Sequence, residues 1–274
     1  MIKKIMDTYF DEHGNSLKPV SLKQIDESLA VLPLPWHKDG YHQFAELMSQ
    51  GAQPDSDESG FPCLFGLAAF QQKYLYVSFY NAMDDENSLS SLSTCFSDFA
   101  TLITRERTME ERKYEGLMCI FKQPRADGTA GSFRDSASIF WSFLQDLNQR
   151  DPSPWPKNAH TDPSSRLFRY CFAGRQWFVI YFSPLHQYRA RQSDNFMVFF
   201  QPPEVFTVHI ETNPNFEKVR TTIRKRVETY AGRSAMVHLA HFADSRPELM
   251  RALGPYWDGA LSNLFGEPPP DEER

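Results

Sequence analysis

A histidine and two arginines follow an apolar, aromatic stretch in WFVIYFSPLHQYRAR, residues 177–191. His186 offers an imidazole, a common axial ligand of haem iron. Arg189 and Arg191 offer guanidinium groups, which form paired hydrogen bonds with carboxylates or propionates. Pro184 ends strand pairing, and a rigid sheet often aims functional side chains from the loop after a strand. From the residues alone, the favoured interpretation is still that all three are solvated loop residues.

Cys63, in FPCLFG (residues 61–66), is a second candidate for chemistry. A cysteine that meets a distant histidine in the fold can act as the nucleophile of a hydrolase. No basic residue stands beside Cys63 in the sequence to activate the thiol. A buried structural cysteine is therefore the favoured interpretation, and a cysteine hydrolase stays open as an alternative.

Common metal and nucleotide motifs are missing from the sequence. It contains no HExxH, CxxC, GxGxxG or GxxxxGK[ST] pattern, which argues against the usual zinc, dinucleotide and P-loop sites. His238 and His241 are three residues apart and would share one face of a helix, but no third metal ligand is evident. Two ordinary polar residues at a helix edge are the favoured interpretation of that pair.

Composition places the chain among soluble globular proteins. It has 274 residues, of which 41% are hydrophobic and 23% charged, enough for a sizeable core. A net charge of −6 argues against general nucleic-acid binding. Four scattered cysteines suit reduced thiols, and the N-terminus does not resemble a signal peptide, so we expect a cytoplasmic protein. The sequence has no apolar run long enough to span a membrane, and a homodimer is the commonest soluble assembly.

Hydrophobic periodicity predicts alternating strands and helices. The expected strands are residues 73–82, 116–123, 167–174, 176–182 and 195–203, with the AGRQ turn joining the third and fourth. The expected helices are residues 41–50, 88–103, 136–149 and 214–230, and a further helical segment ends near Leu264. Turn-rich or Pro-rich loops are expected at residues 51–60, 124–131 and 151–165.

This order predicts a single α/β (α+β) domain with a mixed, largely antiparallel sheet flanked by helices. We place an extended, proline-interrupted lead-in at residues 1–35, the domain at residues 36–266 and a disordered tail at residues 267–274.

Residues from about 36 to 230 resemble the YqcI/YcgG family of bacterial proteins. The similar segments are FPCLFGLAAFQQKYLYVSFY, IFWSFLQDLNQRDPSPWP and TDPSSRLFRYCFAGRQWFVIYFSPLHQYRARQSDNFMVFFQPPEVF. In the last of them a Phe-rich strand runs into Ser-Pro-x-His, an Arg-rich segment and Phe-Gln-Pro, and this block is the most specific. The order and spacing of the three segments carry the resemblance.

The resemblance implies a haem-dependent N-oxygenase of the kind found in guanitoxin and D-cycloserine pathways. Such an enzyme hydroxylates a nitrogen of an amino-acid-derived amine or guanidine, using b-type haem, dioxygen and electrons from a reductase. Carried over residue by residue, it implies that His186 is the proximal iron ligand and that Arg189 and Arg191 pair with the haem propionates. It also implies that Cys63 and Phe200 contact the cofactor, Cys63 as a pocket wall or as a thiolate ligand.

The chain departs from the family pattern at three places. One branch of the family has His-Pro where this chain has Ser183-Pro184, and Asn-Pro-His where it has Gln201-Pro202-Pro203. Both of those histidines are absent here, which leaves His186 as the natural ligand. Relatives often have Arg-Trp where this chain has Pro203-Glu204, so the pocket is expected to differ there.

A cationic substrate would need an acidic partner. Asp84, Asp85 and Glu86 follow the first strand and are candidates, although three adjacent acids more often form a solvated turn. A haem-binding sensor or carrier without turnover would use the same His186 and remains an alternative.

Overall fold

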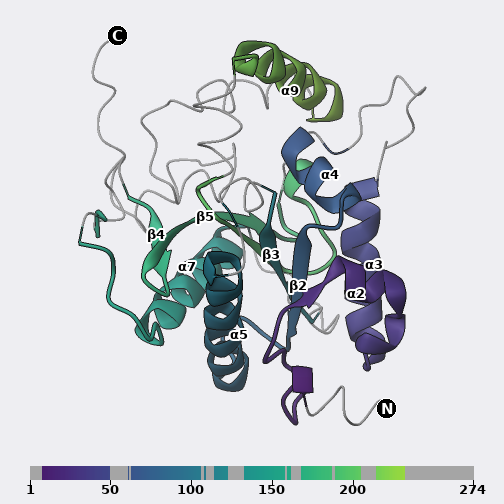
Figure 1. The fold of residues 1–274 in the computed structure, drawn as a ribbon. Helices are drawn as coiled ribbons and strands as arrows, with labels where there is room; N and C mark the ends of the chain where they lie inside the picture. Colours follow the sequence, from purple (N-terminus) through teal and green to yellow (C-terminus); the bar gives the residue numbers. More distant parts are fainter. Residues whose placement is uncertain are drawn as a thin grey trace.

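A mixed six-stranded sheet organises the chain (Figure 1). The computed structural model describes residues 8–49, 61, 63–105, 108, 114–122, 133–157, 159–161, 168–186, 189–204 and 214–231. The strand order is β1-β2-β3-β6-β5-β4, and the β2–β3 pair alone is parallel within the described sheet. The strands are β1 (Val20–Ser21), β2 (Leu75–Tyr80), β3 (Gly116–Phe121), β4 (Tyr170–Phe172), β5 (Arg175–Phe182) and β6 (Met197–Gln201). The predicted fold class, a mixed and largely antiparallel sheet with flanking helices, is confirmed.

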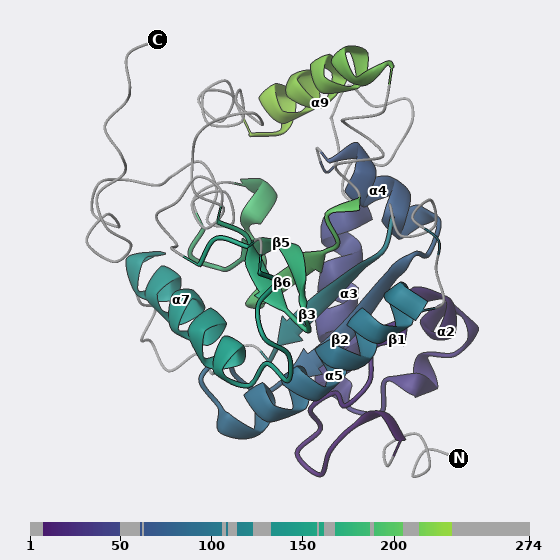
Figure 2. The ribbon, with the colours of Figure 1, turned by 60° about the vertical axis from the view of Figure 1, so that its left-hand side comes forward.

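Helices cover both faces of this sheet, as two views of the ribbon show (Figures 1 and 2). One face packs against α5 (Glu86–Arg105) and α7 (Phe133–Gln149). The other packs against α2 (Leu22–Glu27), α3 (Pro35–Ser49) and α4 (Leu64–Gln71). Each face has its own buried cluster, because successive strand residues point to opposite sides of the sheet. None of the described helices is long and apolar enough to cross a bilayer.

The helices with clear apolar periodicity form where the sequence predicts them. In α5 the residues Leu89, Leu92 and Phe96 are all buried against the sheet. In α7 the predicted face is also buried, except that Ile139 remains 41% exposed. The expected hairpin between β4 and β5 is a two-residue turn at Ala173 and Gly174, both with positive φ (51° and 71°). Positive φ at both central residues matches the right-handed twist of the flanking strands.

The N-terminal residues are more structured than the extended lead-in expected from the sequence. Val20 is fully buried and pairs with Val77 of β2, which makes β1 an edge strand of the sheet. The helix α2 follows at once and begins with a capping box between Ser21 and Gln24. Sequence periodicity cannot reveal a strand of two residues, because its pairing with β2 is set by the tertiary fold.

The register brings the C-terminal ends of three strands, β2, β3 and β5, side by side at one end of the sheet. Tyr80 pairs with Phe121, and Met197 pairs with both Ile120 and Phe182. Because β2, β3 and β5 run in the same direction, the segments that follow these strands all begin at that end of the sheet. Residues 183–196, here called the β5–β6 loop, start there and contain the 3-10 helix η2 (Arg189–Arg191). A second 3-10 helix, η1 (Leu29–Val31), follows α2.

The helix α9 (Phe216–Ala231) matches the expected third helix and lies next to α4 in both views, at the end of the molecule away from the N-terminus (Figures 1 and 2). Other expectations lie outside the described residues: the loops 51–60 and 124–131, the His238/His241 pair, the helical segment near Leu264 and the tail 267–274.

Candidate functional site

His186 is a buried residue at the start of the β5–β6 loop. After Phe182, Ser183 makes one isolated bridge to Gln192, and the chain then turns, with the His186 amide donating to the Ser183 carbonyl at 3.3 Å. His186 is 1% exposed, so it is not the solvated loop residue that the sequence alone predicts. Pro184 lies within this turn, where its missing N–H ends the strand ladder. The end of β5 therefore carries an imidazole into the interior.

The two arginines lie in η2, a few residues beyond His186, and each packs on an aromatic ring. The Arg189 Cζ atom lies 4.5 Å from the centroid of the Tyr230 ring in α9, although Arg189 itself is exposed. The Arg191 Cζ atom lies 5.4 Å from the centroid of the Phe182 ring. Burial raises the pKa of the Tyr230 hydroxyl above its ordinary value, and Arg189 offsets only part of that shift. Stacking on rings holds guanidinium groups in fixed positions while their N–H groups can still donate.

Cys63 lies at the beginning of α4 and contributes to the start of that helix. Its Sγ atom accepts a hydrogen bond from the Gly66 amide at 3.4 Å, which is the position of a helix cap. The side chain is half-buried and packs against the cluster under α3 and α4. The Arg226 Nη2 atom in α9 donates to the neighbouring Phe61 carbonyl at 2.9 Å. Because α9 also holds Arg189 through Tyr230, one helix contacts both the Cys63 segment and η2.

Phe200 lies apart from this group. It is fully buried in the middle of the sheet, where it pairs with Leu117 and Val179. Its ring centroid is 4.4 Å from that of Phe96 in α5. The last residue of β5, Phe182, pairs with Met197 at the other end of β6. The structure therefore does not bring Phe200 together with His186, which follows the end of β5.

The acidic residues after β2 support the fold. Asp85 accepts a hydrogen bond from the Ser88 amide at 2.8 Å, which caps α5, and Glu86 pairs with Arg150. Asp84 is exposed. These contacts agree with a structural turn, and they give Asp85 and Glu86 partners within the protein.

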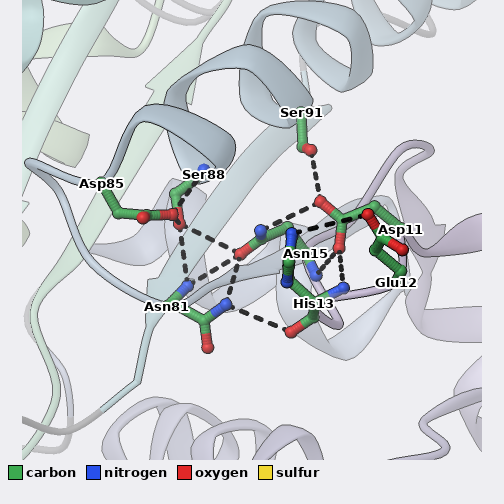
Figure 3. A network of polar contacts seen from close by, with 8 residues as sticks. All are labelled: Asp11, Glu12, His13, Asn15, Asn81, Asp85, Ser88 and Ser91. Carbon is green, nitrogen blue, oxygen red and sulfur yellow. Dashed lines mark hydrogen bonds and ion pairs between the residues drawn. The ribbon is translucent and has the colours of Figure 1, made fainter.

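Asp85 also belongs to a polar network that sequence reasoning did not find (Figure 3). Asn15 is fully buried, and its Oδ1 atom accepts from the Asn81 amide at 2.9 Å and from the Ser88 hydroxyl at 3.0 Å. Asp11 accepts from the Ser91 hydroxyl at 2.7 Å. The network ties the N-terminal segment to the end of β2 and the start of α5. No local signal reveals it, because the hydrogen bonds that join its two halves link residues 66 to 80 positions apart.

A second buried histidine, His37, has a structural role. Its Nε2 atom donates to the Gly14 carbonyl at 2.9 Å, and its ring lies among the rings of Phe10, Trp36 and Phe79. Burial lowers the pKa of His37 to about 4, although the hydrogen bond to Gly14 opposes that shift. His37 is therefore neutral at physiological pH and forms part of the core.

The residue types around His186 are those that a haem group needs. The described residues include no cluster of three metal-ligating side chains, but haem iron needs only one or two protein ligands. His186 is buried, and the guanidinium groups of Arg189 and Arg191 lie in the same loop. Ser183, Ser193 and Asn195 of this loop also carry buried side-chain atoms without a hydrogen-bond partner. The sequence contains no signal for these three residues, since serine and asparagine are ordinary in loops.

Comparison with known proteins gives a family match and three relatives. The sequence pattern described as the YqcI/YcgG family matches residues 49–253. The YqcI protein of Bacillus subtilis (strain 168) is 31% identical over 212 residues, which cover 76% of this chain and 77% of that protein. A Streptomyces lavendulae protein named "Putative N(omega)-hydroxy-L-arginine synthase DcsA" is 27% identical over 243 residues, covering 88% of this chain and 86% of that protein. The YcgG protein of Bacillus subtilis (strain 168) is 26% identical over 210 residues, covering 76% and 77%. No solved structure matches the chain.

Proposed function

Because the chain belongs to the YqcI/YcgG family, we propose that it is a haem-dependent oxygenase that hydroxylates a nitrogen atom of an amino-acid-derived amine or guanidine substrate. The name of the Streptomyces lavendulae relative supports N-hydroxylation of a guanidine. The observation that carries the proposal is the buried position of His186 at the tip of β5. Dioxygen and an electron-donating reductase would be the other reactants.

In this proposal His186 would hold the iron through its imidazole, and Arg189 and Arg191 would pair with the propionates. When bound, haem would be the site at which dioxygen is activated, with electrons that come from the reductase. The protein supplies burial and orientation. The turn at Ser183 and Pro184 fixes the His186 backbone, and the aromatic contacts of Arg189 and Arg191 hold their guanidinium groups in place.

The absorption spectrum of protein produced with a haem supply tests this proposal. The wild type is expected to show a Soret band, and His186→Ala is expected to lose or shift that band and the ferrous-CO spectrum. His37→Phe is the matched control, because His37 is also buried but donates to Gly14. A colourless wild type would refute haem binding, and an unchanged spectrum of His186→Ala would refute the ligand assignment.

Turnover separates the enzyme from a haem sensor or carrier. Steady-state assays with L-arginine and related amines, with a reductase and dioxygen, should yield an N-hydroxylated product that mass spectrometry detects. A haem-loaded protein that forms no such product with any of these compounds would favour the sensor. The cysteine hydrolase instead predicts no Soret band and loss of activity on alkylation of Cys63.

A further inference from the structure

The buried position of His186 raises the question of how a ligand reaches its imidazole, since the side chain is 1% exposed. The chain that follows His186 folds back over the end of β5. The Ser183 amide donates to the Arg191 carbonyl at 3.0 Å, and Ser183 also makes an isolated bridge with Gln192. The Arg191 Cζ atom lies 5.4 Å from the centroid of the Phe182 ring. The 3-10 helix η2 thus helps to close the strand end that carries His186, and a ligand can reach the imidazole only after an element there moves.

The helix α9 holds η2 through an aromatic contact. The Arg189 Cζ atom lies 4.5 Å from the centroid of the Tyr230 ring, and Tyr230 is 5% exposed. A second contact holds α9 beside α4: the Arg226 Nη2 atom donates to the Phe61 carbonyl at 2.9 Å, just before α4 begins. Both views place α9 next to α4, at the end of the molecule away from the N-terminus (Figures 1 and 2). The helix therefore bridges η2 and the segment before α4.

The attachment of α9 is lighter than that of the helices that pack on the sheet. Among its described side chains only Tyr230 is buried, whereas those of Lys218, Thr221, Thr222, Lys225 and Thr229 are exposed. Neither buried cluster of the sheet includes a described residue of α9, whereas α5 and α7 both contribute buried residues to one of them. Elements with few buried apolar contacts open at a lower free energy than the core. We therefore expect α9 to detach while the sheet and the buried His37 stay folded.

We propose that α9 is a movable cover of the β5–β6 loop, and that its release from η2 opens the way from solvent to His186. Tyr230 and Arg226 are the side chains that hold the cover closed. When α9 leaves, Arg189 loses the ring on which it packs, and η2 is free to move away from the end of β5. The cover concerns access to His186 and does not depend on the reaction in the proposed function, although haem would enter by the same route.

Diethyl pyrocarbonate, which modifies accessible imidazole nitrogens, tests the cover in full-length protein produced without a haem supply. Peptide mass spectrometry gives the rate of modification at each histidine. In the wild type His13, whose side chain is 49% exposed, should react quickly. His186 and His37 are 1% and 0% exposed and should react slowly. A buried group reacts through transient opening, so its rate follows the population of the open form.

Variants of α9 should change the rate at His186. Tyr230→Ala should raise it by at least about 10-fold, because this change removes a buried ring and its contact with η2. Arg226→Ala removes the hydrogen bond to Phe61 and should raise the rate by about 5-fold. Tyr230→Phe keeps the ring and should stay within about 3-fold of the wild type. Thr229→Ala, at an exposed position of the same helix, is the matched control and should leave the rate unchanged.

His37 separates release of α9 from a general loss of stability in every sample. A variant that only destabilises the whole fold would raise the rate at His37 at least as much as at His186, whereas release of α9 raises the rate at His186 alone. Three outcomes would overturn the proposal: an increase at His37 as large as that at His186, a His186 rate that neither Tyr230→Ala nor Arg226→Ala changes, and a wild-type His186 that reacts as fast as His13. If Tyr230→Ala does not fold, Arg226→Ala gives the answer.

Haemin uptake tests the proposed function separately. Haemin added to the wild type should produce the Soret band slowly, because association is slow when binding requires a conformational change. Tyr230→Ala should form the same band at least about 10-fold faster. Protein that stays colourless while Tyr230→Ala still exposes His186 selectively would refute the haem reaction alone. Haem-loaded protein with equal uptake and equal His186 modification in all variants would refute the cover alone.

Discussion

Replacing Asp11 by alanine tests whether the polar network in Figure 3 holds the N-terminal segment on the sheet. The Asp11 carboxylate accepts four hydrogen bonds. Two come from the backbone amides of His13 and Asn15, both at 2.8 Å. The other two come from Asn15 Nδ2 at 3.0 Å and Ser91 Oγ at 2.7 Å.

The expected loss follows from which donors are left buried. His13 is exposed, so water can replace the carboxylate at its amide. Asn15 and Ser91 are 0% and 6% exposed, and each would lose a partner at a cost of about 1–2 kcal/mol. We therefore expect Asp11→Ala to lower the free energy of unfolding by about 2–4 kcal/mol. Asp11→Asn keeps one carbonyl oxygen and should cost about half as much.

The dependence of the free energy of unfolding on pH tests the same role of Asp11. Burial by itself raises the pKa of Asp11, but the hydrogen bonds from Ser91, Asn15 and His13 together hold the pKa below its ordinary value. A carboxyl group with a lowered folded pKa contributes its stability above the unfolded pKa of about 3.9, and that contribution is lost as pH falls through the folded pKa. The difference between wild type and Asp11→Asn should therefore be constant above about pH 5 and shrink below about pH 4.

Urea unfolding followed by tryptophan fluorescence measures this difference. Glu12→Ala is the control, because its side chain is 87% exposed and should change stability by less than about 0.5 kcal/mol. The reasoning would be refuted if Asp11→Ala were as stable as Glu12→Ala, or if the difference between wild type and Asp11→Asn persisted unchanged down to pH 2.

Two further perturbations address the buried histidine and the docking of α9. The pKa of His37 is about 4 in the folded protein against ~6.5 when unfolded, so stability should fall as pH drops below about 6.5, by about 3 kcal/mol at pH 4. In urea titrations His37→Phe should lack this part of the acid loss, and equal pH profiles for the two proteins would contradict the assignment. Tyr230→Ala removes a ring that is 5% exposed and packs on Arg189, so amides of α9 and η2 should exchange hydrogen at least about 10-fold faster. Thr229→Ala, on the exposed side of α9, should leave exchange unchanged, and equal rates in the two variants would show that Tyr230 does not hold the helix.

Much of the fold follows from local periodicity. The strands β2 to β6 and the helices α5, α7 and α9 all lie where alternating or helical spacing predicts them. Those elements each bury one face or lie wholly in the core, so their apolar positions repeat with the period of the element. By contrast, α4 is LFGLAAFQ, which is apolar around most of its circumference and lacks a distinct stripe. The strand β1 is too short to have a period at all.

The sequence predicts where the candidate site lies, but it does not predict which side chains turn into the site. The strand that ends at Pro184 and the loop that carries His186, Arg189 and Arg191 could be read from the sequence, and their roles toward haem stay a prediction. Burial separates these residues: His186 is 1% exposed, whereas Arg189 lies at the surface. Which of three neighbouring polar residues turns inward depends on how the loop packs against distant elements such as α9, and local residue types do not encode that packing.

Two sets of the same residue types differ in whether the protein itself satisfies their buried polar atoms. In the network of Figure 3, the Ser88 hydroxyl contacts Asn15, Asn81 and Asp85, so the protein satisfies its own polar atoms. In the β5–β6 loop, the Ser183 hydroxyl is as deeply buried and has no partner among the described residues. Removing a hydrogen-bonded buried hydroxyl leaves its partners unpaired and lowers the free energy of unfolding by about 1–3 kcal/mol. Removing a buried hydroxyl that has no hydrogen bond leaves no partner unpaired and does not carry this cost. Ser88→Ala and Ser183→Ala should therefore differ in the sign of their effect on stability, because only the loss of Ser88 leaves buried partners without their hydrogen bond.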